Sequence, residues 1–201
     1  MGNPLPCGAD EERREPMATG HIDAGKLDER VKVLELAEAS PGVWAWRQAR
    51  TTWASVEQTT RHNVWSVHGI GATGVTMTMR RQALRLGNAL EWRGRHCFLT
   101  AIQPLGRNHM EVSAALVTVS QCEDRMAGIR FPASMTEKYL GHEQREPYAA
   151  NVLRHVLVTP KAIALTPGQL VEVDGTPWPV TLAHTLDLWH NEYELVRTKE
   201  L

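Results

Sequence analysis

The order of polar and apolar residues predicts a chain built mainly of β-strands. From Arg30 to Leu36 the two classes nearly alternate, as expected for a strand with one face in a hydrophobic core. The alternation returns from Val75 to Arg80, and Met110 to Val119 is a further strand of the same block. Patterning with a helical period is scarce along the chain. We therefore predict a mainly β fold class.

Turn residues separate the predicted strands and indicate how two of them pair. Leu90–Trp92 and His96–Ile102 flank the tip Arg93-Gly94-Arg95, which predicts a β-hairpin. After a turn at Ser40-Pro41-Gly42, the strand pattern resumes with the tryptophans 44, 46 and 53. Positions 44 and 46 are two residues apart, so their side chains share one face of a strand.

The stretch from Thr60 to Gly74 has no hydrophobic period and contains Gly69, Gly71 and Gly74. These features predict a loop. It is long for a connection between two strands, and loops of this length in compact domains are usually functional or mobile.

A stretch of the chain repeats itself. A gapless shift of 81 residues aligns Ala83–Ala115 with Ala164–Val196, and nine of the 33 positions are identical. Ordinary composition gives about two identities by chance. Gly94 and Gly175 coincide at predicted turns, where glycine is favoured because it adopts positive φ at little cost. We interpret the pattern as a duplicated β unit, with convergent β patterning as the alternative.

These patterns divide the chain into four segments. They are a flexible N-terminal arm (1–25), a β domain (26–120), a turn-rich connector (121–150) with a helical turn near Thr136–Leu140, and a C-terminal β domain (151–201) that repeats about 83–115.

Charge is nearly balanced over the chain but not along it. The 201 residues include 22 Lys and Arg against 23 Asp and Glu, which argues against a protein that coats nucleic acid over its whole surface. From Arg47 to Arg95 there are eight Arg and two Glu, a net charge of +6, whereas Lys161–Leu201 carries three basic and six acidic residues, net −3. Such a division suits self-assembly or docking between complementary faces, and equally suits ordinary solvated strand faces.

The sequence contains few features of a catalytic or membrane protein. It has no run of 18 apolar residues, no P-loop, no nucleophile elbow and no dinucleotide-binding fingerprint. Cys7, Cys97 and Cys122 are odd in number and far apart, so we expect neither a disulfide framework nor structural zinc. This cysteine usage predicts a reducing cytosol as the natural location of the chain. Cys97 lies among apolar residues, which predicts a buried, inert thiol.

Nine histidines raise the question of a metal site. His184 and His190 lie near Asp187 and Glu192, a set from which a site of two histidines and a carboxylate could be built. A structural or surface role explains these residues more simply. We therefore expect no catalytic residue, no metal and no cofactor.

The block from Leu27 to about Val119 resembles the head–tail joining family of tailed bacteriophages, also called head-closure or stopper proteins. Trp46 with Trp53-Ala54-Ser55-Val56-Glu57 is similar to the family's W…xWAxVE segment, and Leu90–Ile102 is similar to its signature hairpin. The segments that carry the resemblance are Leu27–Val31, Trp46, Thr52–Glu57, Thr76–Arg80, Leu90–Ile102 and Met110–Val112.

The resemblance implies a small antiparallel β-barrel that assembles as a homo-oligomeric ring of six or twelve copies in the virion neck, after synthesis in the bacterial cytoplasm. Its partners would be a portal or adaptor protein above and a tail-terminator or tail-tube protein below. Its role would be to seal the DNA-filled capsid, retain the genome until ejection and offer a platform for the tail.

The resemblance and the composition together supply the candidate site residues. In the family, the long loop projects into the central channel and makes transient, non-specific contact with double-stranded DNA. The corresponding channel candidates are His68, Gly69, Gly71 and Gly74. We place the interface candidates on the arginine-rich faces and on two tryptophans: Arg80, Arg81, Arg93, Arg95, Trp46 and Trp53.

Three other functions remain open from the sequence. The first is another connector of the phage neck, such as an adaptor or tail-terminator. The second is a non-viral β-barrel interaction module that binds a peptide along its tryptophan-rich face. The third is a metal-dependent hydrolase built on His184 and His190.

Overall fold

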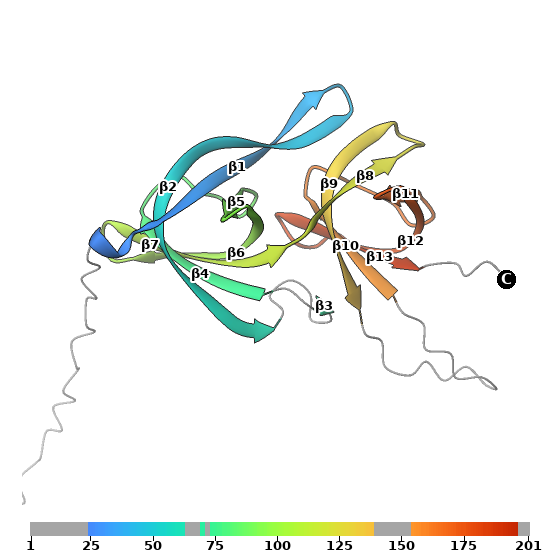
Figure 1. Cartoon of the computed structure of the whole chain (residues 1–201). Coiled ribbons are helices and arrows are strands. Elements are labelled where there is room, and N and C mark those ends of the chain that lie inside the picture. Colours follow the sequence, from blue (N-terminus) through green and yellow to red (C-terminus); the bar gives the residue numbers. More distant parts are fainter. Residues whose placement is uncertain (1–23, 63–68, 71–72, 139–153, 197–201) are drawn as a thin grey trace, which may run out of the picture.

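The computed structural model describes residues 24–62, 69–70, 73–138 and 154–196. Its thirteen strands form one connected sheet, folded into two closed rings that lie side by side (Figure 1). The described residues contain no α-helix, only a short 3₁₀ turn, η1 (Ala24–Lys26), before the first strand. None of their helical segments has the length and apolar character needed to cross a membrane. The prediction of a mainly β fold is confirmed.

Six strands close the first ring. They pair in the order β1-β5-β6-β7-β4-β2, β2 pairs back with β1, and every pairing is antiparallel. Alternate side chains of these strands fill the interior, where Met77, Leu90 and Val112 are fully buried. The strands are β1 (Glu29–Ser40), β2 (Val43–His62), β4 (Thr73–Arg80), β5 (Ala89–Trp92), β6 (Arg95–Leu105) and β7 (His109–Val117).

The predicted hairpin is confirmed as β5 and β6. Its turn consists of Arg93 and Gly94, with φ angles of 51° and 75°. Two successive positive φ values define the tight turn whose twist matches that of the flanking strands. The alternating segments from Arg30 and from Val75 are likewise confirmed as β1 and β4.

A second closed ring follows directly. Its order is β8-β11-β12-β13-β10-β9, with β9 pairing back to β8, and it is again antiparallel throughout. Phe131, Leu157 and Tyr193 are fully buried inside it. Its strands are β8 (Val119–Asp124), β9 (Ile129–Lys138), β10 (Arg154–Pro160), β11 (Leu170–Val173), β12 (Thr176–His184) and β13 (His190–Val196).

The two rings have the same topology, and the 81-residue shift superposes their hairpins residue by residue. It carries β5 onto β11 and the first residues of β6 and β7 onto those of β12 and β13. It also carries the bulge between Leu99 and Ala101 onto the bulge between Val180 and Leu182. Because even the irregularity repeats, the structure supports duplication over convergence.

The connector predicted at 121–150 is wrong over its described part. Residues up to Lys138 form β8 and β9, so the second ring begins at Val119 rather than at 151. Thr136 lies within β9, so the helical turn expected from that position is wrong as well. Residues 139–153 and the N-terminal arm up to residue 23 lie outside the described residues.

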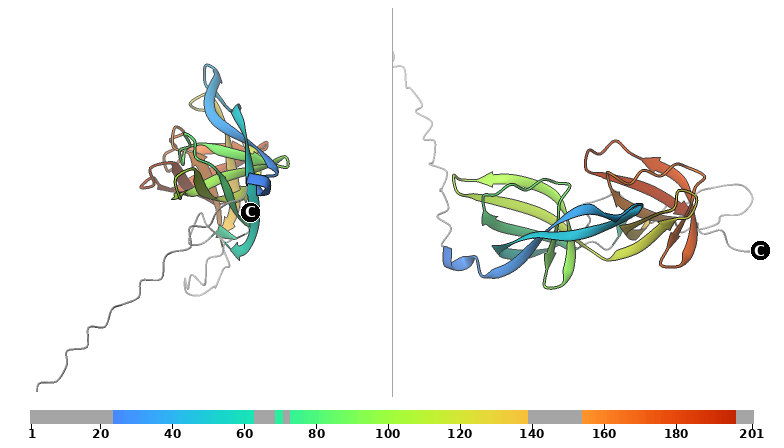
Figure 2. Two further views of the ribbon diagram at one scale, coloured as in Figure 1. Left: turned by 90° about the vertical axis from the view of Figure 1, so that its left-hand side faces the viewer. Right: turned by 90° about the horizontal axis from the view of Figure 1, so that it is seen from above.

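The β1–β2 hairpin of the first ring extends onto the second ring (Figures 1 and 2). In the first ring 17 positions separate the paired residues Val33 and Arg50, whereas in the second ring five separate the equivalent pair Asp124 and Ile129. The additional residues form an arm whose tip packs closely: the Arg130 N–H donates to the Gly42 carbonyl at 2.7 Å.

A third apolar cluster fills the junction between the rings. Leu34, Ala89 and Phe98 from the outer face of the first ring pack with Val156 and Val158 of β10. The arm adds Trp46 to this cluster and Trp44 to the core of the second ring. Both tryptophans thus lie on one face of β2, as their spacing predicted, and the structure shows that this face packs on the second ring.

The loop predicted from Thr60 to Gly74 is shorter at both ends than expected. β2 continues to His62, and β4 begins at Thr73. Gly74 is buried within β4, opposite Ala115, so its assignment as a channel-facing loop residue is wrong. Gly69 opens the two-residue strand β3 (Gly69–Ile70), which pairs with β9. His68 and Gly71 lie outside the described residues.

Candidate functional site

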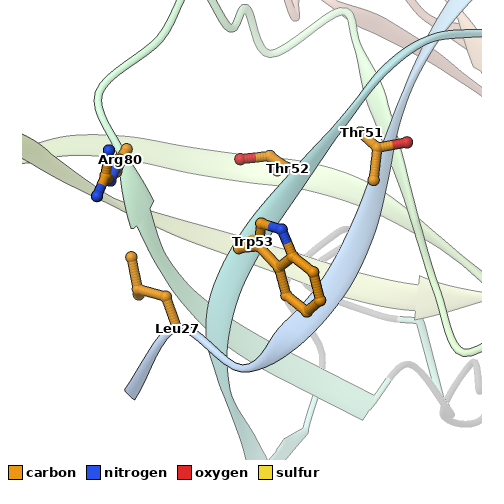
Figure 3. Close-up of a pocket in the computed structure, with 5 residues that line it drawn as sticks. All are labelled: Leu27, Thr51, Thr52, Trp53 and Arg80. Carbon is orange, nitrogen blue, oxygen red and sulfur yellow. The ribbon is translucent and has the colours of Figure 1, made fainter. Parts of the chain in front are cut away.

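A hollow of about 540 Å³ opens on the first ring (Figure 3). Three separate segments line it: Leu27 before β1, Thr51 to Trp53 of β2, and Arg80 at the end of β4. The Trp53 side chain is 56% exposed, which is unusual for so large an apolar group. Trp53 and Arg80, both predicted from sequence as interface residues, are therefore brought together at one site.

Hydrogen bonds join β2 to the segment that follows β4 beside this hollow. Arg50 Nε donates to Gln82 Oε1 at 2.9 Å, and Gln82 Nε2 donates to Thr52 Oγ1 at 3.2 Å. The Arg50 guanidinium also donates to the carbonyl of Ala83. These contacts join β2 to the segment that follows Arg80. The hollow is consequently a fixed surface feature, and among the described residues that line it Arg80 is the only charged one.

The other three arginines proposed for an interface are not among the described residues that line the hollow. Arg93 is engaged within its own ring, where it pairs with Glu29 and lies with its guanidinium carbon 5.0 Å from the Trp92 ring centroid. Hydrogen bonds from Arg93 and then from Trp92 lower the pKa of the Glu29 carboxyl. Arg81 and Arg95 are exposed.

Trp46 belongs to the contact between the two rings of one chain. Its ring centroid lies 5.3 Å from that of His96 and 6.0 Å from that of Phe98. Burial lowers the pKa of His96 to about 4, and the nearby Glu91 charge only partly opposes this. Trp46 thus stabilises the junction inside the chain, a role different from the surface interface that its residue type suggested.

The two histidines of the C-terminal region have different carboxylate partners. His184 Nε2 lies 3.2 Å from Glu194 Oε1, a carboxylate outside the predicted set. His190 is buried, and its Nδ1 lies 3.9 Å from Asp187 Oδ1. Among the described residues no group of three His, Cys, Asp or Glu side chains is arranged to hold a metal ion.

Both described cysteines are buried. Burial raises the pKa of the Cys97 thiol to about 12 and that of the Cys122 thiol to about 12. A thiol with such a pKa carries almost no thiolate near neutral pH, and the thiolate is the reactive form. The prediction that Cys97 is buried is confirmed.

The loop between β12 and β13, residues 185–189, was missed as a functional feature because its sequence predicts only a turn. Leu186 is 98% exposed and Leu188 is 76% exposed, on either side of Asp187. Solvent exposure of two neighbouring leucines on one loop commonly marks a contact surface. The signal in the sequence was the apolar pair itself, which a purely structural turn does not require.

Comparison with known proteins gives no relative: no family model, no curated protein and no solved structure matches the chain.

Proposed function

We propose that this protein is a structural connector of the tailed-phage neck, a ring-forming head-closure protein that seals the DNA-filled capsid and receives the tail. The observation that carries the proposal is the position of the sequence segments similar to that family. They fall, in order, on β1, β2, β4, the β5–β6 hairpin and β7, which are the strands of one closed ring. This ring serves as the small antiparallel β-barrel that the resemblance implies.

The distribution of charge supports assembly through unlike surfaces. Residues 27–117, which include the first ring, carry 11 Lys and Arg against seven Asp and Glu, net +4. Residues 119–196, which include the second ring, carry six against ten, net −4. Two related units of opposite charge favour contact between the first ring of one copy and the second ring of another. A contact of this heterologous kind closes into a ring when the rotation between copies allows it.

A near-neutral chain also suits a channel through which DNA must pass. Each phosphate neutralised by a basic side chain strengthens salt-dependent binding, so a strongly basic lining would retard the genome. We place the loop between β2 and β4 at the channel, with its DNA contact transient and independent of base sequence. Portal or adaptor protein above and tail protein below are the partners of the assembled ring.

Filled capsids that lack tails test this function. Purified chain is added to them, and bound copies per capsid and DNA loss on mild heating are measured. We expect six or twelve copies per capsid and several-fold slower DNA loss, with no binding to capsids that already carry tails. Failure to bind tail-less capsids would remove the proposed function. Binding without DNA retention would replace head closure with an adaptor role, and binding to isolated tails would favour a tail-terminator.

A further inference from the structure

The exposed leucines belong to a loop whose backbone is held in place. Lys161 Nζ donates to the carbonyl oxygens of Thr185 and Asp187, each at 2.7 Å. Asp187 Oδ1 accepts from the backbone N–H groups of Trp189 and His190 at 2.7 and 2.8 Å. Because these bonds order the loop in advance, burying its two leucines against a partner would cost little backbone entropy. We call residues 185–189 the leucine loop.

The leucine loop carries charge as well as apolar surface. Asp187 lies between the two leucines, and its side chain is 61% exposed. Burial alone would raise the pKa of this carboxyl, but the hydrogen bonds from the Trp189 and His190 N–H groups together outweigh it. The pKa is therefore lowered, and the carboxyl is ionised at neutral pH. The loop therefore offers two aliphatic side chains and one anion in a fixed arrangement.

The hollow on the first ring offers the complementary groups. Trp53 and Leu27 supply apolar surface, Arg80 supplies a cation, and the opening of about 540 Å³ has room for side chains of a partner. Among the described residues no ion pair involves Arg80. Tryptophan and arginine in one fixed concave site are the residue types that most often dominate binding energy at protein interfaces.

We propose that the leucine loop of one copy docks into the Trp53–Arg80 hollow of a second copy, with Leu186 and Leu188 against Trp53 and Leu27, and Asp187 beside Arg80. The inference rests on the proposed function and names the contact that would build its ring. In this contact an anion faces a cation, and apolar side chains face apolar side chains.

The two surfaces of one chain cannot readily meet each other. Leu27 follows η1, which lies at the end of the first ring away from the second ring (Figures 1 and 2). The leucine loop is anchored to Lys161 of the second ring, and its Trp189 ring faces Gly87, where a Cβ would lie 3.4 Å away. Each chain therefore offers the hollow to one neighbour and the loop to another, as a heterologous contact requires.

Sedimentation of two loss-of-contact variants tests the proposal. Trp53→Ala removes the apolar wall of the hollow, and the double variant Leu186→Ser/Leu188→Ser removes the apolar part of the loop. All three side chains are exposed, so both variants should fold. We expect the native chain to associate in a concentration-dependent manner and each variant alone to be at least tenfold weaker. The control is Met126→Ser, which alters an 83% exposed side chain on the β8–β9 turn and should associate as the native chain does.

Mixing the two variants gives the decisive outcome. The intact loop of Trp53→Ala can enter the intact hollow of Leu186→Ser/Leu188→Ser, so the mixture should form dimers that neither variant forms alone, and no larger species. A native chain that stays monomeric at high concentration would overturn the inference, as would variants that associate like the native chain or a mixture that stays monomeric. Because this assay uses no capsids, its failure is distinguishable from failure of the proposed function.

Discussion

Arg93 and Asp174 occupy the same position in two copies of one hairpin, and both have a left-handed backbone, with φ of 51° and 47°. Each precedes a glycine of positive φ, and each side chain reaches back to the first strand of its own ring. Arg93 pairs with Glu29 of β1, while Asp174 Oδ1 accepts the Gln121 N–H of β8 at 3.1 Å. The two hairpins thus share the same backbone geometry, and each is anchored to the first strand of its ring. The anchoring side chain is a cation in one hairpin and an anion in the other.

Replacement of Asp174 should show how much the stability of the chain depends on the backbone and the hydrogen bond of this turn. Asp174→Ala places a residue that disfavours left-handed φ at the turn and removes the acceptor for Gln121, so we expect a loss of about 1–2 kcal/mol in the free energy of unfolding. Asp174→Asn keeps an oxygen acceptor and tolerates the backbone, so its loss should be within about 0.5 kcal/mol. Urea denaturation measures both, and equal losses would contradict the anchoring role.

Two glycines of equal φ should respond differently to alanine. Gly42 has φ of 74° and Gly94 has φ of 75°, but a Cβ at position 42 would lie 2.9 Å from the Gly128 carbonyl oxygen, whereas at position 94 no atom is within 4 Å. Gly94→Ala should cost about 1–2 kcal/mol from strain alone. Gly42→Ala should cost at least about 1 kcal/mol more, because the arm tip must move off the second ring. Similar losses in urea denaturation would show that the arm tip is not closely packed.

Acidification should destabilise the folded chain before its carboxylates are protonated. Burial lowers the pKa of His190 to about 4, opposed by Asp187, and lowers that of His96 to about 4, opposed by Glu91. An unfolded chain takes up these protons near pH 6.5, so stability is full above that pH and falls as the pH drops toward 4. We expect a loss of about 2–3 kcal/mol per histidine at pH 4.

Urea denaturation between pH 7 and 4.5 checks this pH dependence. The variant His190→Phe keeps an aromatic ring beside Phe98, which lies 5.4 Å away between centroids, and removes one of the two titrating groups. Its profile should be flatter than that of the native chain. A native stability that does not change over this range would show that the two histidines are not buried in their neutral form.

The two tryptophans predicted as interface residues should differ in how much they contribute to stability. Trp46→Ala removes a side chain from the junction between the rings, and we expect a loss of about 2–3 kcal/mol in unfolding free energy. Trp53→Ala alters an exposed side chain, and its effect should stay within about 0.5 kcal/mol. Thermal unfolding of both variants measures the difference. Strong destabilisation by Trp53→Ala would mean that it is part of the fold rather than of a docking surface.

The buried thiols should react only when the chain unfolds. Near neutral pH, Cys97 and Cys122 carry almost no thiolate, since burial raises both pKa values to about 12. In the variant Cys7→Ser, an aromatic disulfide reagent should therefore find no fast-reacting thiol in the native chain and two after denaturation. If a thiol of the folded Cys7→Ser variant reacts rapidly, the core of at least one of the two rings is not packed as described.

Local patterning predicted the strands of the first ring because one face of each is buried and the other is not. The β5–β6 hairpin was predictable from Arg93-Gly94, since a two-residue turn of positive φ has a strong residue preference. The repeat was visible over β5 to β7 because those strands keep one offset of 81 residues in both rings.

The sequence repeat reveals only part of the second ring, because the long β1–β2 arm of the first ring has no counterpart there. Its first two strands match β1 and β2 at different offsets, because Val33 and Arg50 are 12 positions further apart than Asp124 and Ile129. No gapless shift aligns both. Pro132 within β9 also argued against a strand, since proline cannot donate to a ladder. The sequence therefore indicates a connector at the position where the structure has β9.

For the candidate site too, the sequence indicates individual residues but not which of them come together in the folded chain. Trp53 and Arg80 were predicted singly, but their meeting in one hollow depends on the pairing of Ala54 with Met79 across β2 and β4. The exposure of Leu186 depends on Lys161, 25 positions earlier, which holds the loop through the carbonyl of Asp187. Neither relationship follows from neighbours in sequence.

Electron microscopy of tail-less filled capsids incubated with the purified chain tests the central claim most directly. The account predicts a closed ring of six or twelve copies at a single vertex, below the portal, with the second ring of each chain facing the first ring of its neighbour. Capsids whose portal vertex stays bare at saturating protein, or that bind single unconnected copies, would contradict it.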